Sequence, residues 1–357
     1  NTTGANNTAV GTFAMENNTT GQNNVAVGYQ ALDSNTTGGN NTALGREALD
    51  YNTTANNNTA VGYAALNVNT TGADNTAVGV GALDANTTAS NNTAVGKGAL
   101  TANTTGTRNT AIGSNSGLIN TTGSNNVSVG AYSLRTNATG IYNTAIGDSS
   151  FYNTTVSNNT GVGYAAGYRT TSGAHNTAIG SQALYDNTTG TQNTAVGSEA
   201  LDACTTGSYS TAVGAYALTS ATTGEQNTCI GRSAGIGVTT GNYNCAMGIN
   251  AFSSATSASD SVGIGRQALG NVTTADDNTA VGSLALDACT TGNANTAVGK
   301  GAATAVTTGG QNVIVGENAG VVLTTGNTNT CVGRDSGGQL TTGSNNLLLG
   351  HDAGKSG

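Results

Sequence analysis

The sequence predicts an all-β protein, a parallel β-solenoid or β-roll with 17-residue coils, and three observations lead to this prediction. The pentapeptide that runs from Asn24 to Gly28 recurs about 21 times, and its closing glycine returns every 17 residues with a single deletion. A fixed period over a whole chain is typical of stacked repeats. Runs of only three to five strand-forming residues lie between Gly and Asn turns, without a helical pattern. A disordered chain would not hold this register, because nothing in a solvated coil penalises insertions.

Composition narrows the class of protein further. The chain has 357 residues, including 54 Gly and no Pro, and only 8% of them are charged. A net charge of −8 and a sequence pI near 4.5 disfavour nucleic-acid binding, because no basic run is present to neutralise phosphates. No apolar run approaches the roughly 20 residues of a membrane-spanning helix. We therefore expect one repetitive shaft over residues 1–357, as a segment of a longer chain.

We number each repeat from its closing glycine as position 0, which gives the consensus N-T-A-V-G-x-x-A-L-x-x-N-T-T-G-x-x. Position −1 is always aliphatic or Met, as in Val27, and is therefore expected to point into the core. Position −3 exchanges Thr with Val, as in Val25, and lies on the same face of the strand. Ala26 at position −2 then points away from the core and is a candidate contact with a neighbouring chain.

The remaining positions of the coil carry further expectations. Ala31 at +3 and Leu32 at +4 are adjacent, so on a strand they could not both face one interior. Gly38 at +10 is expected in a tight turn with unusual dihedral angles. Asparagine recurs at −4 and again at +7 through the first half of the chain, as in stacked amide ladders. The predicted ladder residues of this coil are Asn24, Val27, Gly28, Ala31, Leu32 and Asn35.

The core arithmetic points to an oligomer. Each coil offers about two large apolar side chains. Burial of their apolar surface, at about 25 cal/mol per Å², stabilises the coil by little compared with the entropic cost of ordering 17 residues. A neighbouring chain could bury the apolar residues that the coil itself does not. We therefore expect a parallel homo-oligomer, most simply a homotrimer about the fibre axis.

The repeat core resembles a known family. Residues 23–28 (Asn-Asn-Val-Ala-Val-Gly) and 125–130 (Asn-Asn-Val-Ser-Val-Gly) are similar to the NSVAIG repeats of trimeric autotransporter adhesin heads, which also occur in phage and phage-like tail fibres. The resemblance covers every repeat, although the coil here is longer by an N-T-T-G segment. It implies a left-handed parallel β-roll, three chains side by side, and attachment of cells to surfaces or host ligands. An extracellular cell-surface filament or a virion tail fibre is the expected location.

The N-T-T triplets are formally glycosylation sequons. The candidate acceptors are Asn18, Asn35, Asn52, Asn69, Asn86, Asn103 and Asn120. In the second half the same +7 position becomes Cys204, Val238 or Leu323 while the adjacent threonines stay. That exchange favours a half-buried ladder over a glycan.

Ice binding is a further alternative, because threonine rows on solenoids bind ice. A regular outward Thr-x-Thr face is not evident, however, because the adjacent threonines at +8 and +9 point opposite ways. Acidic residues recur at +5 and could attract Ca²⁺, but the gaps in the row favour a solvated stripe that keeps the fibre soluble. This row comprises Asp33, Asp50, Asp84, Asp202 and Asp287.

No residues with the spacing of a catalytic, cofactor or metal site emerge. His175 and His351 fall on variable positions of distant coils and are expected on the surface. The cysteines occupy different ladders or distant coils, so we expect buried free thiols rather than disulfides; they are Cys204, Cys229, Cys245, Cys289 and Cys331. The sequence thus predicts a non-enzymatic fibre shaft that mediates or presents adhesion to an unidentified receptor, with a glycan-coated filament or an ice-binding solenoid as alternatives.

Overall fold

The computed structural model describes residues 2–355 and contains no helix among them, so none of these residues forms a helix that could cross a membrane. The described residues divide into two compact units, one ending at Asn176 and the other beginning at Thr177. In each unit every repeat contributes one strand of three residues. The expectation of one shaft over residues 1–357 stays a prediction.

The first unit contains strands β1 to β10. Each strand pairs in parallel with the next, and the same repeat positions lie opposite each other, as Ala26 does with Ala43. The single deletion shortens the step between β9 and β10 by one residue, yet Thr144 still pairs with Thr160. The strands are β1 (Thr8–Val10), β2 (Val25–Val27), β3 (Thr42–Leu44), β4 (Thr59–Val61), β5 (Thr76–Val78), β6 (Thr93–Val95), β7 (Thr110–Ile112), β8 (Val127–Val129), β9 (Thr144–Ile146) and β10 (Thr160–Val162).

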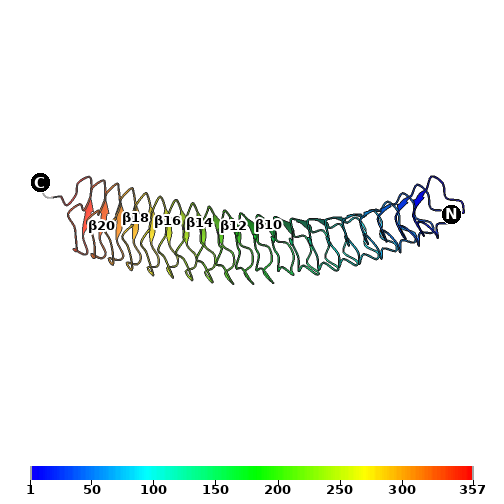
Figure 1. Cartoon of the computed structure of the whole chain (residues 1–357). Helices are drawn as coiled ribbons and strands as arrows, with labels where there is room; N and C mark the ends of the chain where they lie inside the picture. Colours follow the sequence, from blue (N-terminus) through cyan, green and yellow to red (C-terminus); the bar gives the residue numbers. More distant parts are fainter. Residues whose placement is uncertain (1, 356–357) are drawn as a thin grey trace. The chain divides into compact units, whose positions relative to one another are not determined.

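The second unit contains strands β11 to β21, which pair in the same parallel register. The strands are β11 (Thr177–Ile179), β12 (Thr194–Val196), β13 (Thr211–Val213), β14 (Thr228–Ile230), β15 (Cys245–Met247), β16 (Val262–Ile264), β17 (Thr279–Val281), β18 (Thr296–Val298), β19 (Val313–Val315), β20 (Thr330–Val332) and β21 (Leu347–Leu349). Within each unit the coils stack in sequence order (Figure 1). The predicted fold class, a parallel β-solenoid with one repeat per coil, is confirmed.

Coil-to-coil hydrogen bonds continue outside the strands. The backbone N–H of Leu32 donates to Ala48 O at 3.0 Å, and that of Thr36 donates to Thr53 O at 2.8 Å. The Thr36 hydroxyl adds a bond of 3.0 Å to the same carbonyl. The turns are therefore ladders like the strands, and the repeat is held on several sides of the coil.

Left-handed residues bend each coil. In the coil of Gly28, Gln30 at +2 and Leu32 at +4 have φ of 53°, and Asn40 at −5 has φ of 59°. Asn and Asp tolerate this region better than most residues, which explains their frequency at −5. The left-handed conformation costs a leucine about 1–2 kcal/mol. Complete burial of its side chain stabilises the coil by about 1.5–3 kcal/mol, which offsets this cost.

This bend corrects the expectation for positions +3 and +4. Ala31 and Leu32 are both fully buried in the same interior. Alternation between faces applies to extended strands, whereas Leu32 lies in a left-handed turn. The pair therefore needs no second chain to bury one of its members.

Glycine recurs at two positions of the coil for different reasons. Gly28 has φ of +138°, and a Cβ atom there would lie 2.5 Å from Gly45 O in the next coil. Gly38 at +10 has no such φ, so the expected dihedral strain is wrong; a Cβ atom there would instead lie 2.4 Å from Ala55 O. Close stacking of the coils, rather than turn geometry, explains the preference for glycine at +10.

Candidate functional site

The outward face of the strands is the candidate functional site. Residues at −3 and −1 point out of the coil, whereas the residue at −2 points in, so that Ala26 is fully buried and Val27 is 38% exposed. We call the residues at −1 the outward aliphatic file. In the first unit it comprises Val10, Val27, Leu44, Val61, Val78, Val95, Ile112, Val129, Ile146 and Val162, and in the second Ile179, Val196, Val213, Ile230, Met247, Ile264, Val281, Val298, Val315, Val332 and Leu349.

The expected direction of the strand side chains is therefore wrong. Val27 was expected in the core and Ala26 outside it, whereas Ala26 lies in the core and Val27 points outward. The physical reason is volume: Ala31 and Leu32 already fill the interior, so only a small residue fits opposite them at −2. The larger β-branched residue consequently lies outside. Both residues remain members of coil-to-coil ladders, because Val27 pairs with Val10 and Leu44.

The outward aliphatic file is unusual because it is exposed yet never polar. Other exposed positions vary freely: position +1 is Tyr29, Arg46, Tyr63 and Lys97 in successive or nearby coils. A solvated position would be expected to vary in the same way. Continuous exposed apolar surface usually marks a place where another molecule binds.

Buried asparagines at −4 join consecutive coils. Asn24 Oδ1 accepts from the backbone N–H of Asn41 at 2.8 Å, and Asn24 Nδ2 donates to Gly38 O across the coil at 2.9 Å. Where serine replaces asparagine, the hydroxyl keeps part of this role: Ser261 Oγ accepts from the Asn278 N–H at 3.1 Å. The predicted ladder at −4 is confirmed.

The asparagines at +7 form a second buried ladder, as expected. Asn35 Nδ2 donates to Asn18 Oδ1 at 2.7 Å and to Gly38 O at 2.9 Å. The folded coil leaves these amides no room for a glycan, so modification would require an unfolded or opened chain. All seven candidate acceptors lie at this buried position, namely Asn18, Asn35, Asn52, Asn69, Asn86, Asn103 and Asn120.

Most residues that replace asparagine at +7 in the second unit are also buried, whereas Leu340 is half-buried. Val238 and Leu323 continue the interior without an amide. Cys204 donates its thiol to Gly207 O at 3.4 Å, the same type of contact that Asn35 makes with Gly38. The expected change from an amide ladder to an apolar seam is thus confirmed.

The five cysteines are free thiols, and Cys245 alone is only half-buried. Burial raises the pKa of Cys204 to about 12 and of Cys289 to about 11. Cys229 and Cys245 lie on adjacent strands but at −2 and −3, which point to opposite faces. These thiols are therefore protonated at neutral pH and poorly reactive.

The acidic row at +5 is more buried than a solvated stripe. Asp50 is 7% exposed, and desolvation, together with the charges of Asp33 and Glu47, raises its pKa to about 6. Burial likewise raises the pKa of Asp33, Asp84 and Asp287. Part of the row is consequently a source of destabilising charge, which corrects the expectation of a purely solubilising role.

Aromatic and basic residues at variable positions stack along the coils. The guanidinium carbon of Arg46 lies 5.5 Å from the ring centroid of Tyr29 and 5.7 Å from that of Tyr63. Tyr152 and Tyr168 stack with centroids 5.1 Å apart. These contacts join side chains of consecutive coils, although Tyr29 and Tyr63 remain 43% and 49% exposed.

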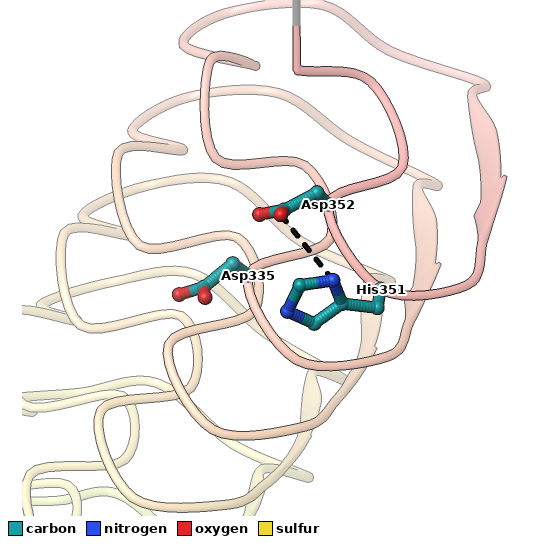
Figure 2. A group of neighbouring side chains, drawn as sticks. All are labelled: Asp335, His351 and Asp352. Atoms are coloured by element: carbon teal, nitrogen blue, oxygen red, sulfur yellow. Dashed lines mark ion pairs between the residues drawn. The ribbon is translucent and has the colours of Figure 1, made fainter.

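One group with the donor set of a metal site occurs in residues 2–355. Asp335, His351 and Asp352 bring one ligand atom each to within 4.8 Å of one another (Figure 2). Arg334 Nη2 lies 2.8 Å from His351 Nε2, and Lys355 Nζ lies 3.0 Å from Asp352 Oδ1. These cations already pair with the ligand atoms, so the group is a surface ion-pair network.

Both histidines lie on the surface, as expected from the sequence. The group of Asp335, His351 and Asp352 was not predicted. Asp335 and Asp352 both occupy position +2 in consecutive coils, and His351 occupies the adjacent position +1. The repeat register was the available signal, because it places equal positions one above the other.

Comparison with known proteins adds no family assignment. No protein-family model matches the chain, and no curated protein matches it either.

Proposed function

We propose that this chain is a structural fibre shaft that associates with copies of itself through the outward aliphatic file, most simply as a homotrimer. The observation that carries the proposal is the consistently apolar character, aliphatic or Met, of a position that is about 36–42% exposed in many coils, as at Val27, Ile112 and Ile230. A partner that covers this face would explain the restriction.

A second copy is the partner that fits this face best. The file repeats once per coil, at the strand spacing of about 4.8 Å. A second copy has the same spacing because it has the same repeat. Closed symmetry is the usual arrangement of such identical subunits. Strands β1–β10 present a face of roughly 480 Å², taking ten strands at about 4.8 Å and about 10 Å of strand length. Two such faces reach roughly 1,000 Å², the lower bound for a specific interface.

The biological role that we propose is attachment. The repeat resembles those of trimeric adhesin heads and tail fibres, and a shaft of this kind would span distance outside a cell or virion and present a tip or lateral surface to a receptor. The proposal assigns no reaction and no cofactor to the chain.

Cryo-electron microscopy of the full chain tests the assembly. Three solenoid lobes in cross-section, with a rise near 4.8 Å along the axis, are expected. A single lobe would contradict the proposal, and two lobes would retain self-association but exclude the trimer.

Ice binding is the second candidate, since the outward face carries threonine beside the aliphatic file. Thr42 and Leu44 point out of the same strand, as do Thr59 and Val61. Ice bound to a flat array of threonine and valine would cover the same surface that a second chain would cover. Thermal hysteresis from the wild-type chain, abolished by replacing the outward threonines with lysine, would favour this candidate over the fibre.

A further inference from the structure

Interior volume is compensated in most coils that have glycine at +4. Glycine occupies this position in six coils, at Gly117, Gly167, Gly235, Gly320, Gly337 and Gly354. In four of them the −2 residue of the same coil is larger than alanine and fills the space; these pairs are Cys229 with Gly235, Ile314 with Gly320, Cys331 with Gly337 and Leu348 with Gly354. The ring of Phe151 occupies the space at Gly167.

The coil of Gly117 is the exception. Its −2 residue is the ordinary Ala111, and the side chain nearest to a Cβ atom on Gly117 would be Leu100, with Cδ2 at 2.9 Å. Beside Gly117 lies a cavity of about 10 Å³, which is lined in part by Asn120, Ser128 and Asn137. This volume corresponds to about one water-sized sphere.

The +7 amide ladder is interrupted at the same place. Asn120 Nδ2 donates to Asn103 Oδ1 at 2.7 Å, continuing the ladder from the preceding coils. Asn137 Nδ2 donates to Gly140 O at 3.0 Å. Asn120 Oδ1 and Asn137 Oδ1 are buried and have no protein donor. Each such orphaned acceptor costs about 1–3 kcal/mol.

The wall combines the apolar side chains of Leu100 and Leu134 with polar groups, and a serine cluster adjoins it. Ser116 Oγ lies 2.8 Å from Ser128 Oγ and 3.0 Å from Ser133 Oγ. Most other coils have alanine at the equivalent positions +3 and −2. Hydroxyl and amide groups therefore lie next to Leu100 and Leu134 where the leucine side chain at +4 is missing.

We infer that this cavity is a binding site for a single water molecule, which donates its two O–H groups to Asn120 Oδ1 and Asn137 Oδ1. The size matches one water, and the two acceptors match its two donors. Buried water commonly satisfies polar groups of this kind. The bound water supplies the missing rung of the amide ladder between consecutive coils. A metal cation is disfavoured, because it would require a larger set of oxygen ligands than this neutral wall supplies.

A high-resolution crystal structure of the full chain tests the inference. Density for one water within hydrogen-bond distance of both Oδ1 atoms is expected. The variant Gly117→Leu restores the residue common at +4 in other coils, at a φ of +59° compared with +50° at Leu100, and is expected to displace this density. An empty cavity, a bound cation, or an Asn137 side chain that bonds directly to Asn120 in the wild type would overturn the inference.

Denaturant unfolding of Asn137→Val gives a second readout if Gly117→Leu does not fold. Valine occupies the same position at Val238 and Val272 and is compatible with the coil. If water bridges the two amides, the variant loses that bridge as well as the bond to Gly140, and its midpoint should fall by a margin similar to that of Asn86→Val. The control residue Asn86 donates directly to Asn69 Oδ1 at 2.8 Å. An unchanged or raised midpoint for Asn137→Val alone would contradict the bound water.

Discussion

A Cβ atom placed on Gly320 would lie 3.2 Å from Ile314 Cγ2, so the glycine at +4 accommodates the isoleucine at −2. Both residues face the interior of one coil, and Ile314 is fully buried. The consensus coil reaches a similar volume with the opposite assignment, a small alanine at −2 and a large leucine at +4. The two positions therefore share one core.

A double-mutant cycle at Ile314 and Gly320 tests this shared core. Gly320→Leu alone should overpack the coil by about 1–3 kcal/mol, and Ile314→Ala alone should leave a cavity that costs about 2–5 kcal/mol. The double variant restores the consensus pair and should cost less than the sum by at least 1 kcal/mol. Additive free energies of unfolding would show that the residues pack independently.

The −4 ladder should be sensitive to loss of the amide. Asn58 Oδ1 accepts from the Asn75 N–H at 3.0 Å, and Asn58 Nδ2 donates to Gly72 O at 2.9 Å. Asn58→Ala leaves both buried partners unpaired and should cost about 2–4 kcal/mol in chemical unfolding. Asn58→Ser should cost less, because Ser261 shows that a hydroxyl keeps the first contact. Equal losses for the two variants would argue against this hydrogen-bond account.

Neighbouring residues of β12 should respond differently to substitution. Ala195 is fully buried, and Ala195→Val should cost about 1–3 kcal/mol at every protein concentration, because it overpacks the chain's own core. Val196 points outward, so Val196→Thr should reduce only the concentration-dependent part of the stability. Thermal unfolding over a hundredfold range of concentration separates the two effects. A large, concentration-independent loss for Val196→Thr would place valine in the core after all.

Stability should fall as the pH rises through the titration of Asp50. Its pKa is about 6 in the folded chain compared with the ordinary value of 3.8, so between these values the folded state binds more protons than the unfolded state. The neutral carboxyl is tolerated at low pH, and its ionisation destabilises the coil by on the order of 2 kcal/mol. Asp50→Asn should flatten the fall between pH 4 and pH 7. An identical pH profile for the variant would exclude Asp50 as its source.

The fold class could be predicted because the fixed period indicates stacked repeats and the short strand-forming runs between Gly and Asn turns indicate β-structure. One repeat per coil places equal positions one above the other, which also predicts the amide ladders at Asn24 and Asn35. The faces of the strand could not be assigned from hydrophobicity, since the aliphatic Val27 is outside and the small Ala26 inside. Hydrophobicity misassigns the faces because Ala31 and Leu32 leave room for only a small side chain at −2.

The sequence did contain a signal for the correct face. Wherever −2 is enlarged to Cys229, Ile314, Cys331 or Leu348, position +4 of that coil is glycine. This compensation identifies −2 and +4 as neighbours in one core. The cavity beside Gly117, by contrast, depends on side-chain positions in three consecutive coils, which the repeat pattern does not specify.

Sedimentation velocity tests the central claim most directly. The wild-type chain should sediment with three times its mass of 34.8 kDa. The variant with Val61→Lys, Val78→Lys and Val95→Lys should sediment at the mass of one chain with an unchanged β-sheet spectrum, because these side chains lie on the outward face. A wild-type chain that remains at 34.8 kDa at high concentration, or a lysine variant that stays trimeric, would contradict association through the outward aliphatic file.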